Sequence, residues 1–171
     1  TDATVLDPAQ HLLFPGSFDP LHHGHEQMAR HAEQMTGRRV VFVMDDTHPD
    51  KGTLAVDELL RRAEQFRWRW PVMLTHDEPL FIDKADARPG FGFLIGADVV
   101  LGILNPKYYG GEIGLKYTLG KIEKCRMKFY VVGRAVDGKF QTLDDLPIQG
   151  MHRDLFVPVS GRWDVASRNL R

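Results

Sequence analysis

The sequence predicts an α/β protein built on a doubly wound, mostly parallel sheet. Short apolar runs alternate along the chain with segments in which apolar residues recur at helical spacing. The alternation continues over nearly the whole length, which favours strands joined by crossover helices. With 43% hydrophobic and 26% charged residues, the composition is that of an ordinary globular protein. No repeat or linker divides the chain, so we expect one domain over residues 1–171.

The first half of the chain supplies three strands and two helices. The run Val40–Met44 is continuously apolar, as expected for a strand covered on both faces. Gly37 ends the helix before it, and the polar segment Asp45–Thr53 after it predicts a loop. The expected strands are His11–Phe14, Val40–Met44 and Val72–Thr75, and the expected helices are His25–Thr36 and Val56–Phe66.

The second half continues the pattern with shorter segments. Asp137-Gly138 has the composition of a tight hairpin turn. The expected strands are Phe93–Ile95, Lys128–Val132 and Leu155–Pro158, and the expected helices are Leu115–Cys125 and a segment from Val165 onward. Ligands of such sheets bind at the carboxyl ends of the strands, so polar residues that follow strands are the candidates for function.

Charge and cysteine content exclude several function classes. The 22 Lys and Arg residues balance 23 Asp and Glu residues, which argues against a dedicated nucleic-acid binder. An anionic ligand therefore needs a local basic pocket. The single cysteine, Cys125, excludes a disulfide framework and a multi-cysteine metal site, and we expect it half-buried at a helix end. The longest apolar stretch, Phe93–Leu104, is interrupted by Asp98, so we expect a cytoplasmic protein without a membrane partner.

The loop after the first strand carries the strongest chemical signal. It leads into a helix, whose free N–H groups form an anion site. Gly16 lets the backbone approach a phosphate closely, and Gly24 tightens the turn so that His22 and His25 face the same way. Two imidazoles there can donate hydrogen bonds to phosphate oxygens. A metal site is disfavoured because no third ligand follows at a fixed spacing.

The segment Gly16–His25 resembles the signature of the nucleotidyltransferase superfamily, a G-[ST]-F-[DN]-P turn followed by H-x-G-H. Nicotinamide and nicotinate mononucleotide adenylyltransferases, pantetheine-phosphate adenylyltransferases and cytidylyltransferases share it. The resemblance implies a Rossmann-like fold and transfer of a nucleotidyl group to a substrate phosphate, with Mg²⁺ entering with the nucleotide. Gly96-Ala97-Asp98 resembles the G-A-D of the mononucleotide adenylyltransferases, so ATP and a nicotinamide or nicotinate mononucleotide are the first expected substrates.

The same resemblance implies roles for individual residues. His22, His25 and Arg171 would act in catalysis by contacting the triphosphate and stabilising the transition state. Arg62 falls where the family carries an arginine in its second helix. No metal ligand is implied, and a second copy of the chain is an expected partner because family members are often oligomers. The nucleotide-binding residues implied are Gly16, Ser17, Phe18, Asp19, Gly24, Lys51, Asp98, Arg134, Ser167 and Arg168.

Two departures keep alternatives open. Ala166 and Arg168 replace a serine and a threonine of the family's I-S-S-T-x-x-R motif, and Tyr108-Tyr109 follow G-A-D where a tryptophan is usual. The alternatives are a cytidylyltransferase, a pantetheine-phosphate adenylyltransferase, or a nucleotide-binding module with impaired turnover. Asp98 also has the position of a helix N-cap, and Arg134 that of a surface ion-pair partner.

Overall fold

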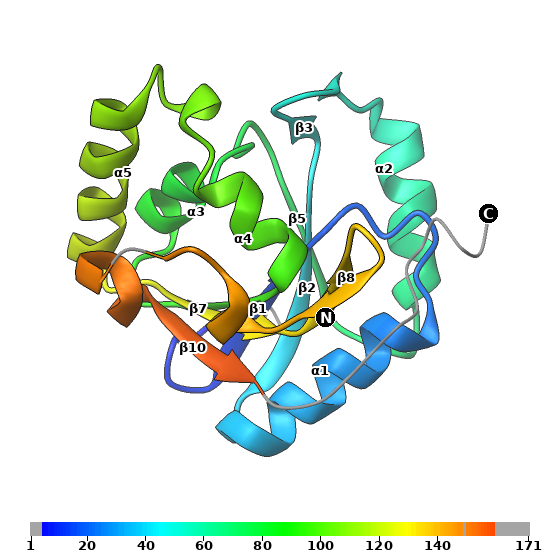
Figure 1. The fold of residues 1–171 in the computed structure, drawn as a ribbon. Coiled ribbons are helices and arrows are strands. Elements are labelled where there is room, and N and C mark those ends of the chain that lie inside the picture. The colour runs from blue at the N-terminus through cyan, green and yellow to red at the C-terminus, as the bar shows by residue number, and fades with distance from the viewer. Residues whose placement is uncertain (1–4, 149, 160–171) are drawn as a thin grey trace.

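A six-stranded parallel sheet forms the centre of the computed structural model, which describes residues 5–148 and 150–159. The strands lie in the order β10-β7-β6-β1-β2-β5 (Figure 1). They are β1 (His11–Pro15), β2 (Arg39–Asp45), β5 (Val72–Thr75), β6 (Gly92–Gly96), β7 (Lys128–Val132) and β10 (Phe156–Val159). Two antiparallel hairpins stand apart from the sheet, β3 (Thr47–His48) with β4 (Gly52–Thr53), and β8 (Arg134–Val136) with β9 (Lys139–Gln141).

The connections between the strands are mostly helical. The α-helices are α1 (His23–Thr36), α2 (Val56–Ala63), α3 (Phe81–Ala87), α4 (Ala97–Ile103) and α5 (Glu112–Lys124). Short 3-10 turns are η1 (Glu64–Phe66), η2 (Pro106–Tyr108), η3 (Leu143–Asp145) and η4 (Gly150–Leu155). In the described part of the chain, no helix is long and apolar enough to cross a membrane.

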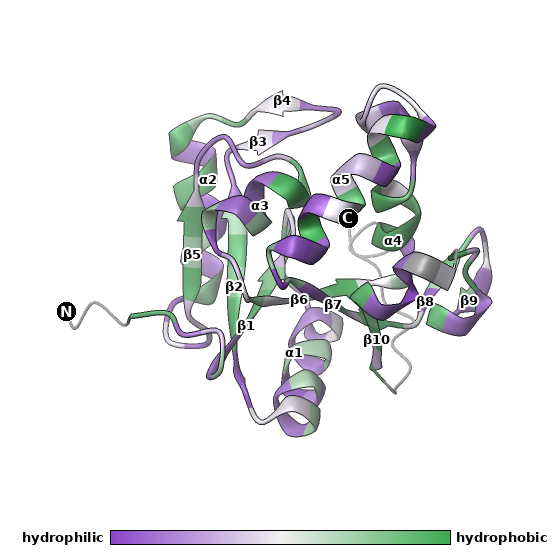
Figure 2. Ribbon diagram, turned by 90° about the vertical axis from the view of Figure 1, so that its left-hand side faces the viewer, coloured by the Kyte–Doolittle hydropathy of each residue, from purple (hydrophilic) through white to green (hydrophobic). Residues whose placement is uncertain are grey.

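The apolar strands are covered on both faces because their side chains alternate between two cores. Leu13, Val41 and Val43 belong to the core with α3, α4 and α5. Leu12 and Phe42 point the other way, into the core with α1 and α2. The strands are therefore mostly green in Figure 2, as expected for a sheet with helices on both faces.

The sheet reverses its winding between β1 and β6. From β1 the chain proceeds outward through β2 to β5, and then returns to the other side for β6, β7 and β10. This is the doubly wound order of a Rossmann-like fold, in which ligands bind at the carboxyl ends of the strands beside the reversal. After β1, the N-cap and first turn of α1 hold His22 and His25, and α4 after β6 holds Asp98, so both sides of the reversal carry predicted site residues.

All six predicted strands are present, with ends that differ by a residue or two. The short helix α3 was not predicted, and α4 was implied only by the N-cap position of Asp98, because each spans seven residues and gives little periodicity. The expected loop Asp45–Thr53 contains the β3–β4 hairpin. Asp137 and Gly138 both have positive φ, 50° and 79°, which confirms the predicted hairpin turn. The helix expected from Val165 lies outside the described residues.

Candidate functional site

His22 and His25 form a stacked pair at the start of α1. His22 is the N-cap, with extended backbone angles (φ −140°, ψ 170°). The backbone N–H of His25 donates to His22 Nδ1 at 3.4 Å, and the N–H of His22 donates to His25 Nδ1 at 3.2 Å. The two ring centroids are 3.6 Å apart with 20° between the planes. Each ring therefore holds the other residue's backbone, and the helix begins two residues before the predicted His25.

These contacts determine which ring nitrogen carries the proton. Because each Nδ1 accepts a backbone N–H, a neutral ring must carry its proton on Nε2. The Nε2 of His22 is buried and has no hydrogen-bond partner among the described residues. Burial lowers the pKa of His22, and burial with the neighbouring His22 lowers the pKa of His25 to about 3. At neutral pH the pair thus presents two neutral Nε2–H donors, and a buried donor without an acceptor favours binding of a polar ligand.

Arg134 and Asp98 meet above Gly96, beside the histidine pair. A Cβ at Gly96 would lie 2.4 Å from Asp98 Oδ1 and 2.8 Å from Arg134 Cγ, so these two side chains leave no room for a side chain at position 96. Arg134 Nη1 approaches Met28 Sδ of α1 at 3.5 Å, and its charge contributes to the lowered pKa of both histidines. The structure records no carboxylate within ion-pair distance of Arg134 in the described chain. This arrangement brings a cation toward the pair.

The N-cap interpretation of Asp98 is wrong. Gly96 is the N-cap of α4, with φ −84° and ψ 159°, and Asp98 is the second helical residue. The carboxylate still lies in the first turn of α4, above the carboxyl end of β6. Asp98 is therefore free to contact a ligand at the edge where His22 and His25 also lie.

Residues of α2 and η1 hold the loop that precedes the pair. Gln65 accepts a hydrogen bond from the Leu21 N–H at 2.8 Å and donates one to the Phe18 carbonyl at 2.8 Å. Arg62 donates to the Ser17 carbonyl at 3.4 Å and pairs with the Asp19 carboxylate at 3.5 Å. The loop conformation is thus fixed by side chains from a segment more than 40 residues away.

Packing explains two further residues of the signature. Phe18 has a positive φ of 45°, and its ring is buried against Phe14 and His25, so only its backbone is available to a ligand. A Cβ at Gly16 would lie 2.8 Å from the Phe18 ring, which explains the need for glycine. Gly24 is buried in the first turn of α1.

A cleft of about 520 Å³ opens beside this loop, at the carboxyl end of β2. Gly16, Ser17 and Asp19 line its edge, and Lys51 lines it from the β3–β4 hairpin. Tyr108 donates a hydrogen bond from its hydroxyl to Asp50 at 2.6 Å. The other lining residues include Val43, Met44, His48, Leu54, Leu59, Phe81, Lys84, Ile103 and Tyr109. The lining also holds the carboxylates Asp45, Asp46 and Asp50, so the cleft combines apolar walls with side chains of both charges.

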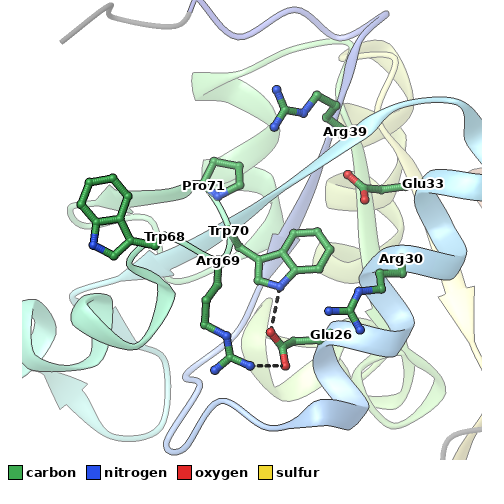
Figure 3. A pocket seen from close by; sticks show the side chains of 8 residues that line it. All are labelled: Glu26, Arg30, Glu33, Arg39, Trp68, Arg69, Trp70 and Pro71. Carbon is green, nitrogen blue, oxygen red and sulfur yellow. Dashed lines mark hydrogen bonds and ion pairs between the residues drawn. The ribbon is translucent and has the colours of Figure 1, made fainter.

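A second hollow, of about 490 Å³, lies along α1 and contains none of the predicted site residues (Figure 3). At its floor the buried carboxylate of Glu26 accepts hydrogen bonds from Arg69 at 2.7 Å and Trp70 Nε1 at 3.0 Å. Since Glu26 follows His25, these bonds anchor the turn that carries the pair. We assign the hollow this structural role.

Three predicted residues, Ser167, Arg168 and Arg171, lie outside the described part of the chain. Sequence reasoning missed Gln65, whose side chain acts on a distant loop, and it assigned no role to His48 or Lys84. No local pattern identifies them, because the tertiary fold brings them to the cleft. In the described residues, no group of three or more His, Cys, Asp or Glu side chains is placed to hold a metal ion.

Comparison with known proteins identifies a family that matches this chain. The family model described as cytidylyltransferase-like matches residues 13–167, which is most of the chain. Two curated relatives, both named phosphopantetheine adenylyltransferase and from two strains of Nitratidesulfovibrio vulgaris, are 33% identical over 90 residues. The match covers 52% of this chain and 44% of each relative, so it spans less than half of their length.

Proposed function

Because the chain belongs to the cytidylyltransferase-like family, we propose that it is a nucleotidyltransferase that moves an adenylyl group from ATP to a phosphate-bearing acceptor. The observation that carries the proposal is the ring of His22, which stacks on His25 at a helix start beside the sheet reversal and whose buried Nε2 has no partner among the described residues. Such a donor pair suits the triphosphate of a nucleotide.

In the proposed reaction, an oxygen of the acceptor phosphate attacks the α-phosphorus of ATP, and the bond to the leaving pyrophosphate breaks. No covalent enzyme intermediate is needed, so the protein acts by positioning and by stabilising charge. The Nε2–H groups of His22 and His25 donate to the oxygens on which charge develops, and Arg134 adds a positive charge. Ser167, Arg168 and Arg171 would neutralise the departing pyrophosphate. Mg²⁺ would enter with the triphosphate as part of the substrate.

The cleft beside the loop is the proposed acceptor site. A nicotinamide or nicotinate mononucleotide is the first candidate, supported by the G-A-D sequence. Tyr108 and Tyr109 line the cleft, but they stand where the mononucleotide adenylyltransferases usually have a tryptophan. The second candidate is 4′-phosphopantetheine, supported by the name of the curated relatives. Both have a phosphate at one end and a body that fits between apolar walls.

Release of pyrophosphate tests the proposal directly. The protein is incubated with ATP or CTP and each of three acceptors: nicotinamide mononucleotide, nicotinate mononucleotide and 4′-phosphopantetheine. We expect turnover with ATP and one of these acceptors. Turnover with CTP in place of ATP would instead identify a cytidylyltransferase. Binding of a nucleotide without any release of pyrophosphate would refute the enzyme proposal and favour a binding module.

A further inference from the structure

Lys84 is a buried cation in the wall of the cleft. It lies on α3 with 7% of its surface exposed. Its Nζ donates to the backbone carbonyl of Glu78, and no carboxylate within the described residues comes within ion-pair distance of it. An ammonium group has three donors, and burying its charge without a counterion is costly. Lys84 thus has one backbone acceptor and no direct ion-pair contact in the described part of the chain.

The carboxylates around Lys84 are already occupied by other partners. Asp45 accepts hydrogen bonds from the Thr75 hydroxyl at 2.6 Å and from the backbone N–H groups of Thr47 and Glu78. The Glu78 carboxylate pairs with Arg88 at 2.6 Å. Asp83 accepts from the Leu80 N–H at 2.9 Å. Burial is the largest influence on the pKa of Lys84 and lowers it, while Asp45, Glu78 and Asp83 oppose that shift.

Two further cleft residues add donors near the lysine. His48 Nδ1 accepts the Asp50 N–H at 3.0 Å, so the neutral ring carries its proton on Nε2. Burial lowers the pKa of His48, the charges of Lys51 and Lys84 add to that shift, and Asp50 opposes it. His48 and both lysines line the same cleft. By contrast, the acids that line the cleft have partners: Asp50 accepts from Tyr108, for example.

We propose that Lys84, which lines the cleft together with His48 and Lys51, recognises a second anionic group on the acceptor, distinct from the phosphate that reacts. This rests on the proposed function, in which the cleft is the acceptor site. A carboxylate is the expected group, because it would accept hydrogen bonds from the ammonium of Lys84 and bring a negative charge into direct contact with it. An acceptor that ends in a neutral amide or thiol brings no such charge. Lys84 is therefore a specificity-determining residue.

Two pairs of acceptors that differ in charge at this second group test the inference. Nicotinate mononucleotide is compared with nicotinamide mononucleotide, and 4′-phosphopantothenate with 4′-phosphopantetheine, by kcat/KM for pyrophosphate release from ATP. For the pair that the wild-type protein uses, we expect the carboxylate member to be favoured by at least about tenfold, as a charge-assisted hydrogen bond supplies. In Lys84→Met, which keeps a side chain of similar length, the ratio falls to about one. Lys116→Met, an exposed lysine of α5, is the control and keeps the wild-type ratio.

The outcomes separate the two proposals. Turnover with equal use of both members, a preference for the uncharged member, or a preference that survives in Lys84→Met would overturn the inference and leave the transfer reaction standing. Release of pyrophosphate with none of the four acceptors would overturn both. The preference of the wild-type protein for the carboxylate member needs no variant, so it tests the inference even where Lys84→Met folds poorly.

Discussion

Replacing His22 by asparagine or by alanine separates the two roles that the structure gives to its ring. Nδ1 caps α1 by accepting the His25 N–H, while Nε2 is a buried donor without a partner in the described structure. Asparagine is among the best N-cap residues and keeps an acceptor at this point, but it has no group at the place of Nε2. Alanine loses both.

The expected magnitudes differ for stability and for turnover. Both variants remove the Nε2 donor, and only alanine also removes the cap acceptor. Loss of an N-cap acceptor costs about 1 kcal/mol, so we expect His22→Ala to melt about 2–4 °C below His22→Asn for a protein of this size. His22→Asn keeps the cap and removes a buried unsatisfied donor, whose burial costs about 1–3 kcal/mol, so it should be at least as stable as the wild type. Both variants lose a donor to developing charge, which lowers kcat by about 10²–10³.

Thermal unfolding and pyrophosphate release measure the two effects on the same samples. The matched control is His23→Asn, because His23 is the exposed neighbour in the first turn of α1 and should change neither property. Wild-type kcat in His22→Asn would refute the assignment of Nε2 as a ligand donor. Equal melting temperatures for His22→Asn and His22→Ala would refute the assignment of Nδ1 as the cap.

Three further predictions concern the surroundings of the pair. Gln65→Leu removes both hydrogen bonds from this side chain to the loop, so we expect a loss of about 1–3 kcal/mol in unfolding free energy and at least a tenfold fall in kcat. An unchanged kcat would show that these two bonds do not position the histidines. The pKa of His25 is about 3 in the folded protein against 6.5 in the unfolded chain. The neutral His25 ring therefore contributes fully to the free energy of unfolding above pH 6.5, and this contribution falls as the pH drops toward 3. Denaturant unfolding should therefore show a loss of about 2 kcal/mol at pH 5 from this group, and His25→Asn should lose correspondingly less; an equal loss in both would contradict the shift. Tyr108→Phe breaks the hydrogen bond to Asp50 at the cleft. Steady-state kinetics should show a rise of about twofold to tenfold in the acceptor KM with kcat unchanged. An effect on kcat alone would contradict a role of Tyr108 in acceptor binding.

The sequence by itself determined the sheet and the loop that carries the pair. Apolar runs such as Val40–Met44 identify buried strands because burial on both faces requires an uninterrupted apolar segment. The spacing of His22 and His25 around Gly24 predicted two rings on one side of a helix start, and the structure confirms that they stack. These features are local, so a short stretch of sequence is sufficient to show them.

Only the tertiary structure decided what surrounds them. The protonated nitrogen of each histidine follows from hydrogen bonds made within the folded turn. The two hydrogen bonds from Gln65 to the loop join it to Leu21, 44 positions away in sequence, and to Phe18, 47 positions away. Lys84 shows no pattern in sequence, since its lack of a direct ion-pair contact in the described chain results from how α3 packs and from the partners that Asp45 and Glu78 already have. Burial and long-range pairing depend on the whole fold, and they therefore cannot be inferred from the neighbours of a residue along the chain.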